Sequence, residues 1–132
     1  MADRPRIRDI MATALVTLTP EMEINRAAAI LLERGISGAP VLDSHGGLVG
    51  ILSKKDCLRA ALHASYYRDW GGQVSKYMTA DPHTLDADLD IVEAAEAFLG
   101  SSYRRFPVLS GGALVGQVSR ADILRGLYEH WS

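Results

Sequence analysis

Apolar residues recur at helical spacing in two stretches of the chain, four in each, at positions i, i+3, i+4 and i+7. They are Ile24, Ala27, Ala28 and Leu31 in the first stretch and Ile91, Ala94, Ala95 and Phe98 in the second. This spacing puts each set on one face, so it predicts two amphipathic helices. We expect the first helix to begin at Thr19, as a cap followed by Pro20, and to end at Gly35. Asp86 is the corresponding cap of the second helix.

Each helical stretch is followed by two short apolar runs, which indicate strands joined by a turn. The predicted strands are residues 36–42 and 48–52 in the first half and residues 103–109 and 113–118 in the second. Proline has no N–H to donate to a β-ladder. We therefore expect Pro40 and Pro107 to lie on a sheet edge or at the start of a strand.

A second helical pattern closes each half. Its apolar positions are Leu58, Ala61 and Leu62 in the first half and Leu124, Leu127 and Tyr128 in the second. Each half therefore reads as a short strand, a helix, two strands and a closing helix, and this order predicts an α/β fold.

The two halves also repeat each other residue by residue. The string GLVGILSKKDCLRAAL at residues 47–62 recurs as ALVGQVSRADILRGLY at residues 113–128. Repetition on this scale indicates a repeat fold, and a unit of about 60 residues leaves one apolar face uncovered. We therefore predict that the two copies pack against each other around a single core.

The charge balance argues against several classes of protein. With 14 basic and 16 acidic residues, the chain lacks the basic surplus of a nucleic-acid-binding protein. Arg4, Arg6 and Arg8 form one local basic cluster, a pattern typical of a solvated tail. No apolar stretch reaches the roughly 18 to 20 residues of a membrane span, and no charged-then-apolar leader is present. These features predict a cytoplasmic protein that binds neither nucleic acid nor membrane.

Catalytic and metal-ligating patterns are missing from the sequence. The four histidines, His45, His63, His83 and His130, lack the spacing of metal ligands, so we predict no metal site. Cys57 corresponds to an isoleucine in the second half, which favours a buried small hydrophobe over a nucleophile. No serine lies in a G-x-S-x-G motif. We therefore expect neither catalytic residues nor a required cofactor.

One motif with candidate chemistry occurs in both halves: a glycine, two mainly apolar residues, a serine, two variable residues and an aspartate. It spans residues 50–56 and 116–122. Ser-x-x-Asp before a helical pattern is typical of a helix cap. A helix start after a strand also attracts anions, and Lys54, Lys55 and Arg120 lie beside it. The aspartate can accept hydrogen bonds from both hydroxyls of a ribose. Two interpretations of the motif therefore remain open, a helix cap alone and a ligand-binding site.

The duplicated order of these elements resembles a tandem pair of cystathionine-β-synthase-type (CBS) domains, the arrangement called a Bateman module. The resemblance rests on residues 10–11 and 77–79 at the start of each repeat, residues 35–43 and 103–109 in the middle, and the two motif strings. It implies one module over residues 1–132, with CBS repeat 1 at residues 7–64, an aromatic linker at 65–75 and CBS repeat 2 at 76–130. The implied fold is α/β, with two β-α-β-β-α repeats packed with pseudo-twofold symmetry.

The resemblance also implies that adenosine-containing ligands, namely AMP, ADP, ATP or S-adenosylmethionine, bind in two clefts between the repeats. The first predicted cleft contains Ser53, Lys54, Asp56, Met78, His83, Tyr103, Arg104 and Arg105. The second contains Ser119, Arg120, Asp122, Met11, Val16, Ile36, Ser37 and Gly38. Because the first cleft is richer in cations, we expect a polyphosphate to prefer it.

Aromatic residues near the ends of the closing helices leave core packing and self-association open. They are Tyr66, Tyr67, Trp70, Tyr128 and Trp131. The resemblance favours self-association, because such modules commonly form homodimers that bury these helices. Our main hypothesis is a non-catalytic nucleotide sensor that acts on a regulated protein. The alternative is a structural module that dimerises or docks a partner and uses Ser-x-x-Asp only as a cap.

Overall fold

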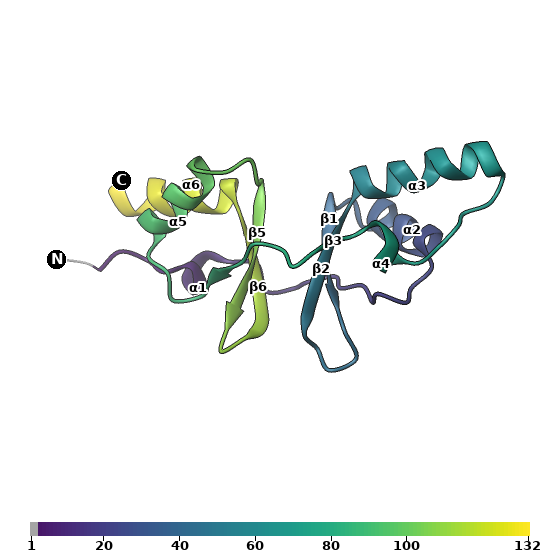
Figure 1. Ribbon diagram of the computed structural model, residues 1–132. Coiled ribbons are helices and arrows are strands. Elements are labelled where there is room, and N and C mark those ends of the chain that lie inside the picture. The colour runs from purple at the N-terminus through teal and green to yellow at the C-terminus, as the bar shows by residue number, and fades with distance from the viewer. Residues whose placement is uncertain (1–2) are drawn as a thin grey trace. The chain divides into compact units, whose positions relative to one another are not determined.

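The structure is a computed structural model that describes residues 3–132 (Figure 1). The chain forms two compact units. The central unit is Val16–Pro82, and the terminal unit combines the described residues up to Leu15 with His83–Ser132. Each unit contains helices and one three-stranded sheet, so the predicted α/β class is confirmed.

The central unit is built around a short antiparallel sheet. Its elements are α2 (Ile24–Arg34), β1 (Gly38–Leu42), β2 (Leu48–Ser53), α3 (Lys54–Tyr67), α4 (Val74–Tyr77) and β3 (Thr79–Ala80). β2 lies in the middle and is antiparallel to β1 and to β3. Leu18 adds a single parallel bridge to Val41 on the other side of β1. The helices cover one face of this sheet (Figure 1).

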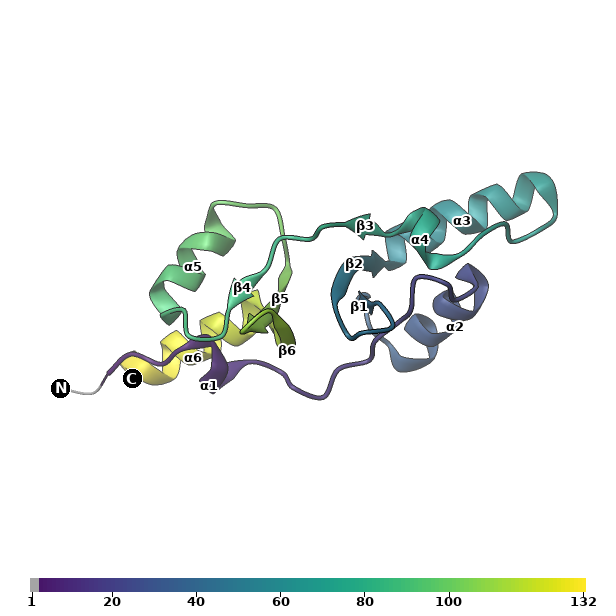
Figure 2. The same ribbon diagram turned by 60° about the horizontal axis from the view of Figure 1, so that its bottom comes forward.

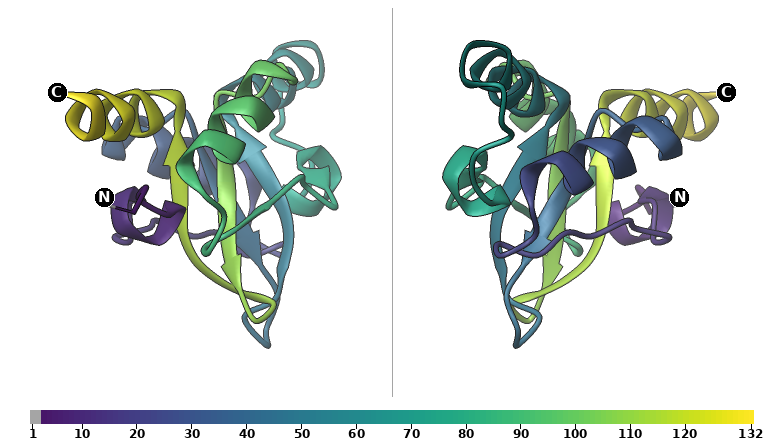
Figure 3. Two further views of the ribbon diagram at one scale, coloured as in Figure 1. Left: turned by 90° about the vertical axis from the view of Figure 1, so that its left-hand side faces the viewer. Right: turned by 90° about the vertical axis from the view of Figure 1, so that its right-hand side faces the viewer.

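The terminal unit repeats this plan. Its elements are α1 (Ile7–Ile10), β4 (Leu85–Asp86), α5 (Ile91–Leu99), β5 (Arg105–Ser110), β6 (Ala113–Ser119) and α6 (Arg120–Trp131). β5 lies in the middle, parallel to β4 and antiparallel to β6. Ala12 forms a single bridge to Gln117 on the far side of β6. This position relative to β6 is equivalent to that of β3 relative to β2 in the central unit. Here too, α5 and α6 lie on one face of the sheet (Figure 3).

Each compact unit contains the chain that leads into the other sequence repeat. The first lead-in segment, residues 4–12, carries α1 and packs on α6 and β6 (Figure 2). The second, residues 71–79, carries α4 and packs on α2, α3 and β2. Ile7 and Val74 anchor these segments, since both side chains are fully buried. Neither repeat therefore completes its core with its own residues alone.

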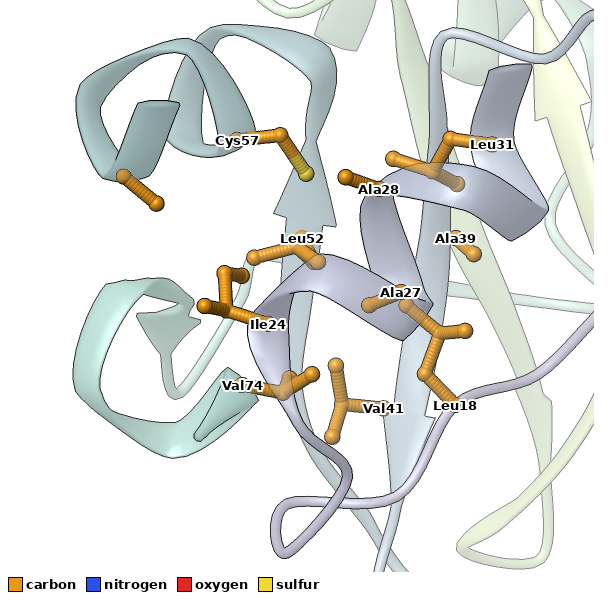
Figure 4. Close-up of a cluster of buried hydrophobic side chains, with 11 residues drawn as sticks. Leu18, Ile24, Ala27, Ala28, Leu31, Ala39, Val41, Leu52, Cys57 and Val74 are labelled. Carbon is orange, nitrogen blue, oxygen red and sulfur yellow. The ribbon is translucent and has the colours of Figure 1, made fainter. Parts of the chain in front are cut away.

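The apolar faces predicted for the two amphipathic helices form two separate cores, one in each unit, so the prediction of a single core shared by the two copies is wrong. All four predicted residues of α2 are buried, and of the α5 set three are buried and Ala95 is partly buried. Figure 4 shows the Val74 side chain of α4 beside Ile24 and Val41 in the central core. The periodicity thus predicts these faces correctly.

Both amphipathic helices begin later than predicted. The residue before α2 is Glu23, whose side chain makes no capping hydrogen bond, and the residue before α5 is Asp90, whose side chain does; they stand in place of Thr19 and Asp86. Residues 19–22 and 86–89 instead form turns closed by hydrogen bonds to the Thr19 and Asp86 carbonyls. In the first case the carbonyls of residues 20 and 22 accept hydrogen bonds from the second lead-in segment, so they are not free to start a helix there. Gly35 ends α2 as predicted, in the left-handed conformation at φ 62°.

The strand predictions hold except at their ends and at one proline. β1 and β5 each begin two residues later than predicted. Pro40 lies on β1, an edge strand of its sheet, as expected. Pro107 lies within β5, the middle strand of its sheet, so the edge prediction is wrong there. β4 pairs only with Val108 and Leu109, so its ladder does not require the N–H that Pro107 lacks.

The closing helices α3 and α6 form as predicted, but most of the apolar residues that mark them are exposed. Apart from Asp56, their buried positions are Cys57 and Ala60 in α3 and Ile123 and Gly126 in α6. These small or compact residues allow the helices to pack closely, whereas the larger side chains face away from the core. Within residues 3–132, none of the helices has both the length and the apolarity needed to traverse a bilayer.

Candidate functional site

The duplicated Ser-x-x-Asp motif forms the same structure in both units. Ser53 ends β2 and caps α3, and Ser119 ends β6 and caps α6. Each serine Oγ accepts a hydrogen bond from the backbone N–H of Asp56 or Asp122, at 3.2 Å in both cases. Each aspartate Oδ2 in turn accepts the serine N–H at 2.9 Å. The capping interpretation of the motif is therefore confirmed.

An arginine one helical turn further on contacts each aspartate. Arg59 Nη1 donates to Asp56 Oδ1 at 2.6 Å, and Arg125 Nη1 donates to Asp122 Oδ1 at 3.2 Å. The side chain of Asp56 is 8% exposed and that of Asp122 is 21% exposed. Neither arginine was predicted to have a role, although the Asp-x-x-Arg spacing places the two side chains on one helix face.

Cations and backbone N–H groups surround each cap. Lys54 and Lys55 lie in the first turn of α3, Arg120 is the first residue of α6, and all three are exposed. The unpaired N–H groups and the dipole of a helix start favour negative charge. Each junction therefore combines a carboxylate that accepts hydrogen bonds with a local positive potential, which suits a ligand bearing both hydroxyls and an anionic group.

Five other predicted site residues belong to the central unit. Gly38 pairs with Ser53 across β1 and β2, and the Ser37 carbonyl accepts the Lys54 N–H at 2.9 Å, so the start of β1 lies beside the cap. Met78 packs so closely on β2 that a Cβ added at Gly50 would lie 2.6 Å from its Sδ. The remaining two, Val16 and Ile36, are half-buried.

The corresponding residues of the terminal unit have the same arrangement. Arg105 pairs with Ser119, and the Arg104 carbonyl accepts the Arg120 N–H at 3.2 Å. A Cβ added at Gly116 would lie 2.7 Å from the Sδ of Met11, as at the equivalent glycine of the central unit.

An aromatic pair precedes this strand in the terminal unit. The ring of His83 lies 5.2 Å from the ring of Tyr103, at an interplanar angle of 37°. Both side chains are exposed.

Each predicted cleft combines residues from the central unit with residues from the terminal unit. That grouping remains a prediction. Within each unit, the structure brings the serine-aspartate cap together with the start of the neighbouring strand and with the methionine of the lead-in segment that packs there.

The three N-terminal arginines are exposed, as expected of solvated residues, but they do not form a free tail, because two are ion-paired and the third donates to a backbone carbonyl. Arg4 pairs with Asp90 at 2.9 Å, and Arg8 pairs with Asp88 at 2.7 Å. Arg6 donates to the Asp88 carbonyl at 2.6 Å. The hydrogen bond from Arg8 lowers the pKa of the Asp88 carboxyl and raises the pKa of the Arg8 guanidinium.

Cys57 is buried, as predicted for a packing residue. Burial, and secondarily the nearby Asp56 carboxylate, raises the pKa of its thiol, which disfavours the reactive thiolate. Across the described residues 3–132, no group of three or more His, Cys, Asp or Glu side chains is placed to hold a metal ion.

Comparison with known proteins relates these features to a family. The family model for the CBS domain matches the chain twice, at residues 7–63 and 74–129. The chain is 36% identical over 124 residues to an A-adding tRNA nucleotidyltransferase of Aquifex aeolicus, covering 94% of this chain but only 14% of that enzyme. It is 30% identical over 125 residues to an uncharacterized 17.7 kDa protein of Acidianus ambivalens, of which it covers 74%.

Solved structures of the same fold are similar over nearly the whole chain. CBSX2 in complex with AMP gives a TM-score of 0.83 at 26% identity, covering 96% of this chain and 98% of that one. CBSX2 is a CBS-pair protein from Arabidopsis thaliana. The CBS domain pair of protein MJ0100, in complex with 5′-methylthioadenosine and S-adenosylmethionine, gives a TM-score of 0.80 at 25% identity, covering 98% and 99%. The chain therefore belongs to the CBS-domain family and is a tandem CBS pair.

Proposed function

We propose that this CBS pair is a non-catalytic regulatory module that binds an adenosine-containing ligand, namely AMP, ADP, ATP or S-adenosylmethionine. The observation that supports this most strongly is the duplicated strand-to-helix junction, in which Asp56 or Asp122 lies on the first turn of a long helix. CBSX2 binds AMP, and the MJ0100 pair binds 5′-methylthioadenosine and S-adenosylmethionine. All three ligands contain an adenosine group.

The chemistry of each junction matches the parts of such a ligand. The aspartate accepts charge-assisted hydrogen bonds from ribose hydroxyls. The helix start and the neighbouring Lys54 or Arg120 stabilise a phosphate. Because both cations repel the sulfonium of S-adenosylmethionine, we expect a phosphorylated ligand to bind more tightly than S-adenosylmethionine.

Calorimetric titration tests this proposal. AMP, ATP and S-adenosylmethionine are titrated into the wild type, Asp56→Asn, Asp122→Asn and the double variant. Asparagine retains an oxygen that can accept the serine N–H, so the helix cap is kept while the charge is lost. Each loss of a hydrogen bond to a charged group costs about 1.5 to 3 kcal/mol, or roughly 10- to 100-fold in affinity at that site. Asp69→Asn, an exposed acid outside the motif, is the matched control. Undiminished binding by the double variant contradicts the site assignment.

A thermal-unfolding series separates a sensor from a purely structural module. A ligand at 100 times its dissociation constant stabilises the protein that binds it by about 2.7 kcal/mol. A melting temperature that does not move with any of the three ligands supports the structural alternative.

We also propose that the chain forms a homodimer through α3 and α6. The observation that favours this is a stripe of large apolar side chains on each helix, every one of them between 57% and 76% exposed. The stripes consist of Leu58, Leu62 and Tyr66 on α3 and of Leu124, Tyr128 and Trp131 on α6. Exposed apolar patches of this kind mark interaction surfaces, and the aromatic residues are not core residues.

The mass in solution tests the dimer. Light scattering on the wild type should give twice the monomer mass of 14.3 kDa. Leu62→Lys and Tyr128→Lys should shift the protein toward the monomer. Leu32→Lys, an equally exposed leucine on α2, should not. A wild type that stays monomeric at high concentration contradicts the proposal.

A further inference from the structure

The two aspartates of the motif have different numbers of hydrogen-bond acceptor positions already in use. A carboxylate offers about four such positions. Asp56 uses three, because Oδ2 accepts both the N–H and the hydroxyl of Ser53 and Oδ1 accepts Arg59. Asp122 uses two, for the Ser119 N–H and for Arg125. Among the hydrogen bonds of residues 3–132, the Ser119 hydroxyl makes none to Asp122.

This difference matters for a ribose, because its two neighbouring hydroxyls require two acceptor positions on one carboxylate. Asp122 has two positions left and can accept both hydroxyls without losing a protein contact. Asp56 has one position left and must release a donor before it accepts the second hydroxyl.

Arg59 is the donor that leaves at least cost. Its side chain is 59% exposed, so water can replace its bond to the carboxylate. The Ser53 hydroxyl is half-buried, and its oxygen is held in place by the Asp56 N–H at 3.2 Å. Releasing this hydroxyl from Asp56 would leave a half-buried donor without its charged partner.

We propose that Arg59 competes with the ribose for Asp56, so that the two sites are unequal and a nucleoside without phosphate groups fills the Asp122 site first. This inference rests on the proposed adenosine binding and adds a regulation of that site. Arg59 is a positioning residue that acts through the carboxylate, and the equivalent Arg125 makes a longer bond and leaves two acceptor positions free.

The test uses neutral nucleosides, so that attraction between the arginine and a phosphate does not contribute. Adenosine and 2′-deoxyadenosine, which lacks one ribose hydroxyl, are titrated into proteins that retain a single aspartate. Asp122→Asn keeps the Asp56 site, and Asp56→Asn keeps the Asp122 site.

In the protein that keeps Asp56, Arg59→Met should tighten adenosine binding by about tenfold, the effect of roughly one hydrogen bond to a charged group. It should tighten 2′-deoxyadenosine binding much less, because one hydroxyl already finds a free position. The dissociation constant of 2′-deoxyadenosine divided by that of adenosine should therefore rise, a change that a merely structural role of Arg59 would not produce. Arg59→Lys keeps a donor and should behave as the parent does.

Arg125→Met, in the protein that keeps Asp122, is the matched control and should leave the ratio within about twofold, since no donor has to leave there. An unchanged ratio in Arg59→Met, with adenosine still bound, overturns the competition and leaves the proposed function standing. If the wild type binds none of adenosine, AMP, ADP, ATP and S-adenosylmethionine, the proposed function and this inference both fail.

Discussion

The two lead-in segments make the same backbone contacts with their units and differ in charge. Each forms three hydrogen bonds at equivalent positions. They are Ile7 N–H to Leu89 O, Arg8 N–H to Ala87 O and Ile91 N–H to Pro5 O in the terminal unit, and Val74 N–H to Met22 O, Ser75 N–H to Pro20 O and Ile24 N–H to Gly72 O in the central unit. Among the ion pairs of residues 3–132, those of the lead-in segments all belong to the first one, through Arg4 and Arg8, whose counterparts in the second are Gly71 and Ser75.

The shared contacts show what attaches a lead-in segment to its unit, and the ion pairs show what strengthens that attachment in one unit. Both segments share one fully buried apolar side chain and one set of backbone bonds, so these features define the attachment. The ion pairs occur in one unit only and lie at the surface, where the interaction between charges is weak and depends on salt. Charge therefore modifies the strength of an attachment that burial already provides.

The largest expected effect comes from removing the buried anchor. Ile7→Ala should lower the free energy of unfolding by about 2 to 5 kcal/mol, because it leaves a cavity in the core of the terminal unit. Val74→Ala removes fewer carbons and should cost less. Denaturant unfolding measures both, and Ile7→Val, at about 0.5 to 1.5 kcal/mol, is the graded control. A cost near zero for Ile7→Ala would mean that the ion pairs, and not burial, hold the first segment.

The N-cap side chains of α5 and α2, which lie beside the two lead-in segments, should differ by about 1 kcal/mol in their contribution to the free energy of unfolding. The Asp90 carboxylate accepts the Val92 N–H at 2.7 Å and also pairs with Arg4, whereas the side chain of Glu23 makes no capping bond. Asp90→Ala should therefore destabilise the protein and Glu23→Ala should not. Asp90→Asn keeps an acceptor for the cap and isolates the contribution of the ion pair. Equal losses in the two alanine variants would contradict this difference.

A smaller effect is expected from the exposed pair of Arg8 and Asp88. Arg8→Gln should lower the melting temperature less than Asp90→Ala does, and the loss should vanish in 1 M NaCl, where the screening length falls to about 3 Å. The converse variant sharpens the comparison. Ser75→Arg places an arginine opposite Glu21, the counterpart of Asp88, and should give the central unit a salt-sensitive gain. A salt-independent effect of Arg8→Gln would point to packing of its stem instead.

The smallest effect concerns acid. The pKa of Asp88 is lowered chiefly by the hydrogen bond from Arg8, and that of Asp43 by the N–H groups of Gly47 and His45. Because both folded values are lowered, each stabilises the protein above the unfolded value of about 3.9 and loses its contribution as the pH falls through the folded pKa.

In urea unfolding between about pH 5 and pH 2, the free energy of unfolding of Asp88→Asn and of Asp43→Asn should therefore fall less steeply with decreasing pH than that of the wild type. High salt should abolish the Asp88 contribution and spare that of Asp43, whose donors are backbone groups. The same salt response for both would show that Arg8 is not the dominant cause at Asp88.

Local patterns predicted the parts of the fold that local interactions determine. The i, i+3, i+4 spacing correctly predicted the buried faces of α2 and α5. The starts of these helices were wrong because segments distant in the sequence use the carbonyls that precede them, and no local cap signal reports this. In α3 and α6 the large apolar residues indicated helices correctly but not the buried face, which Cys57, Ala60 and Gly126 provide through close packing.

The candidate site follows the same division. Ser-x-x-Asp is a short-range pattern, and both caps formed as it predicts. The arginines at Asp-x-x-Arg spacing were within reach of the same reasoning and were missed. The pairing of Arg8 with Asp88 spans most of the chain, and nothing near either residue indicates it.

The exchanged lead-in segments bear on how such a chain arises and how it can be divided. An ancestor of half the length would have lacked a buried anchor for its own core. It could have completed that core only as a dimer in which each copy's lead-in segment packs on the other copy. Gene fusion makes this exchange of segments intramolecular, so it no longer depends on protein concentration. Proteolysis within residues 65–70 would accordingly give two fragments that stay interlocked rather than two free domains.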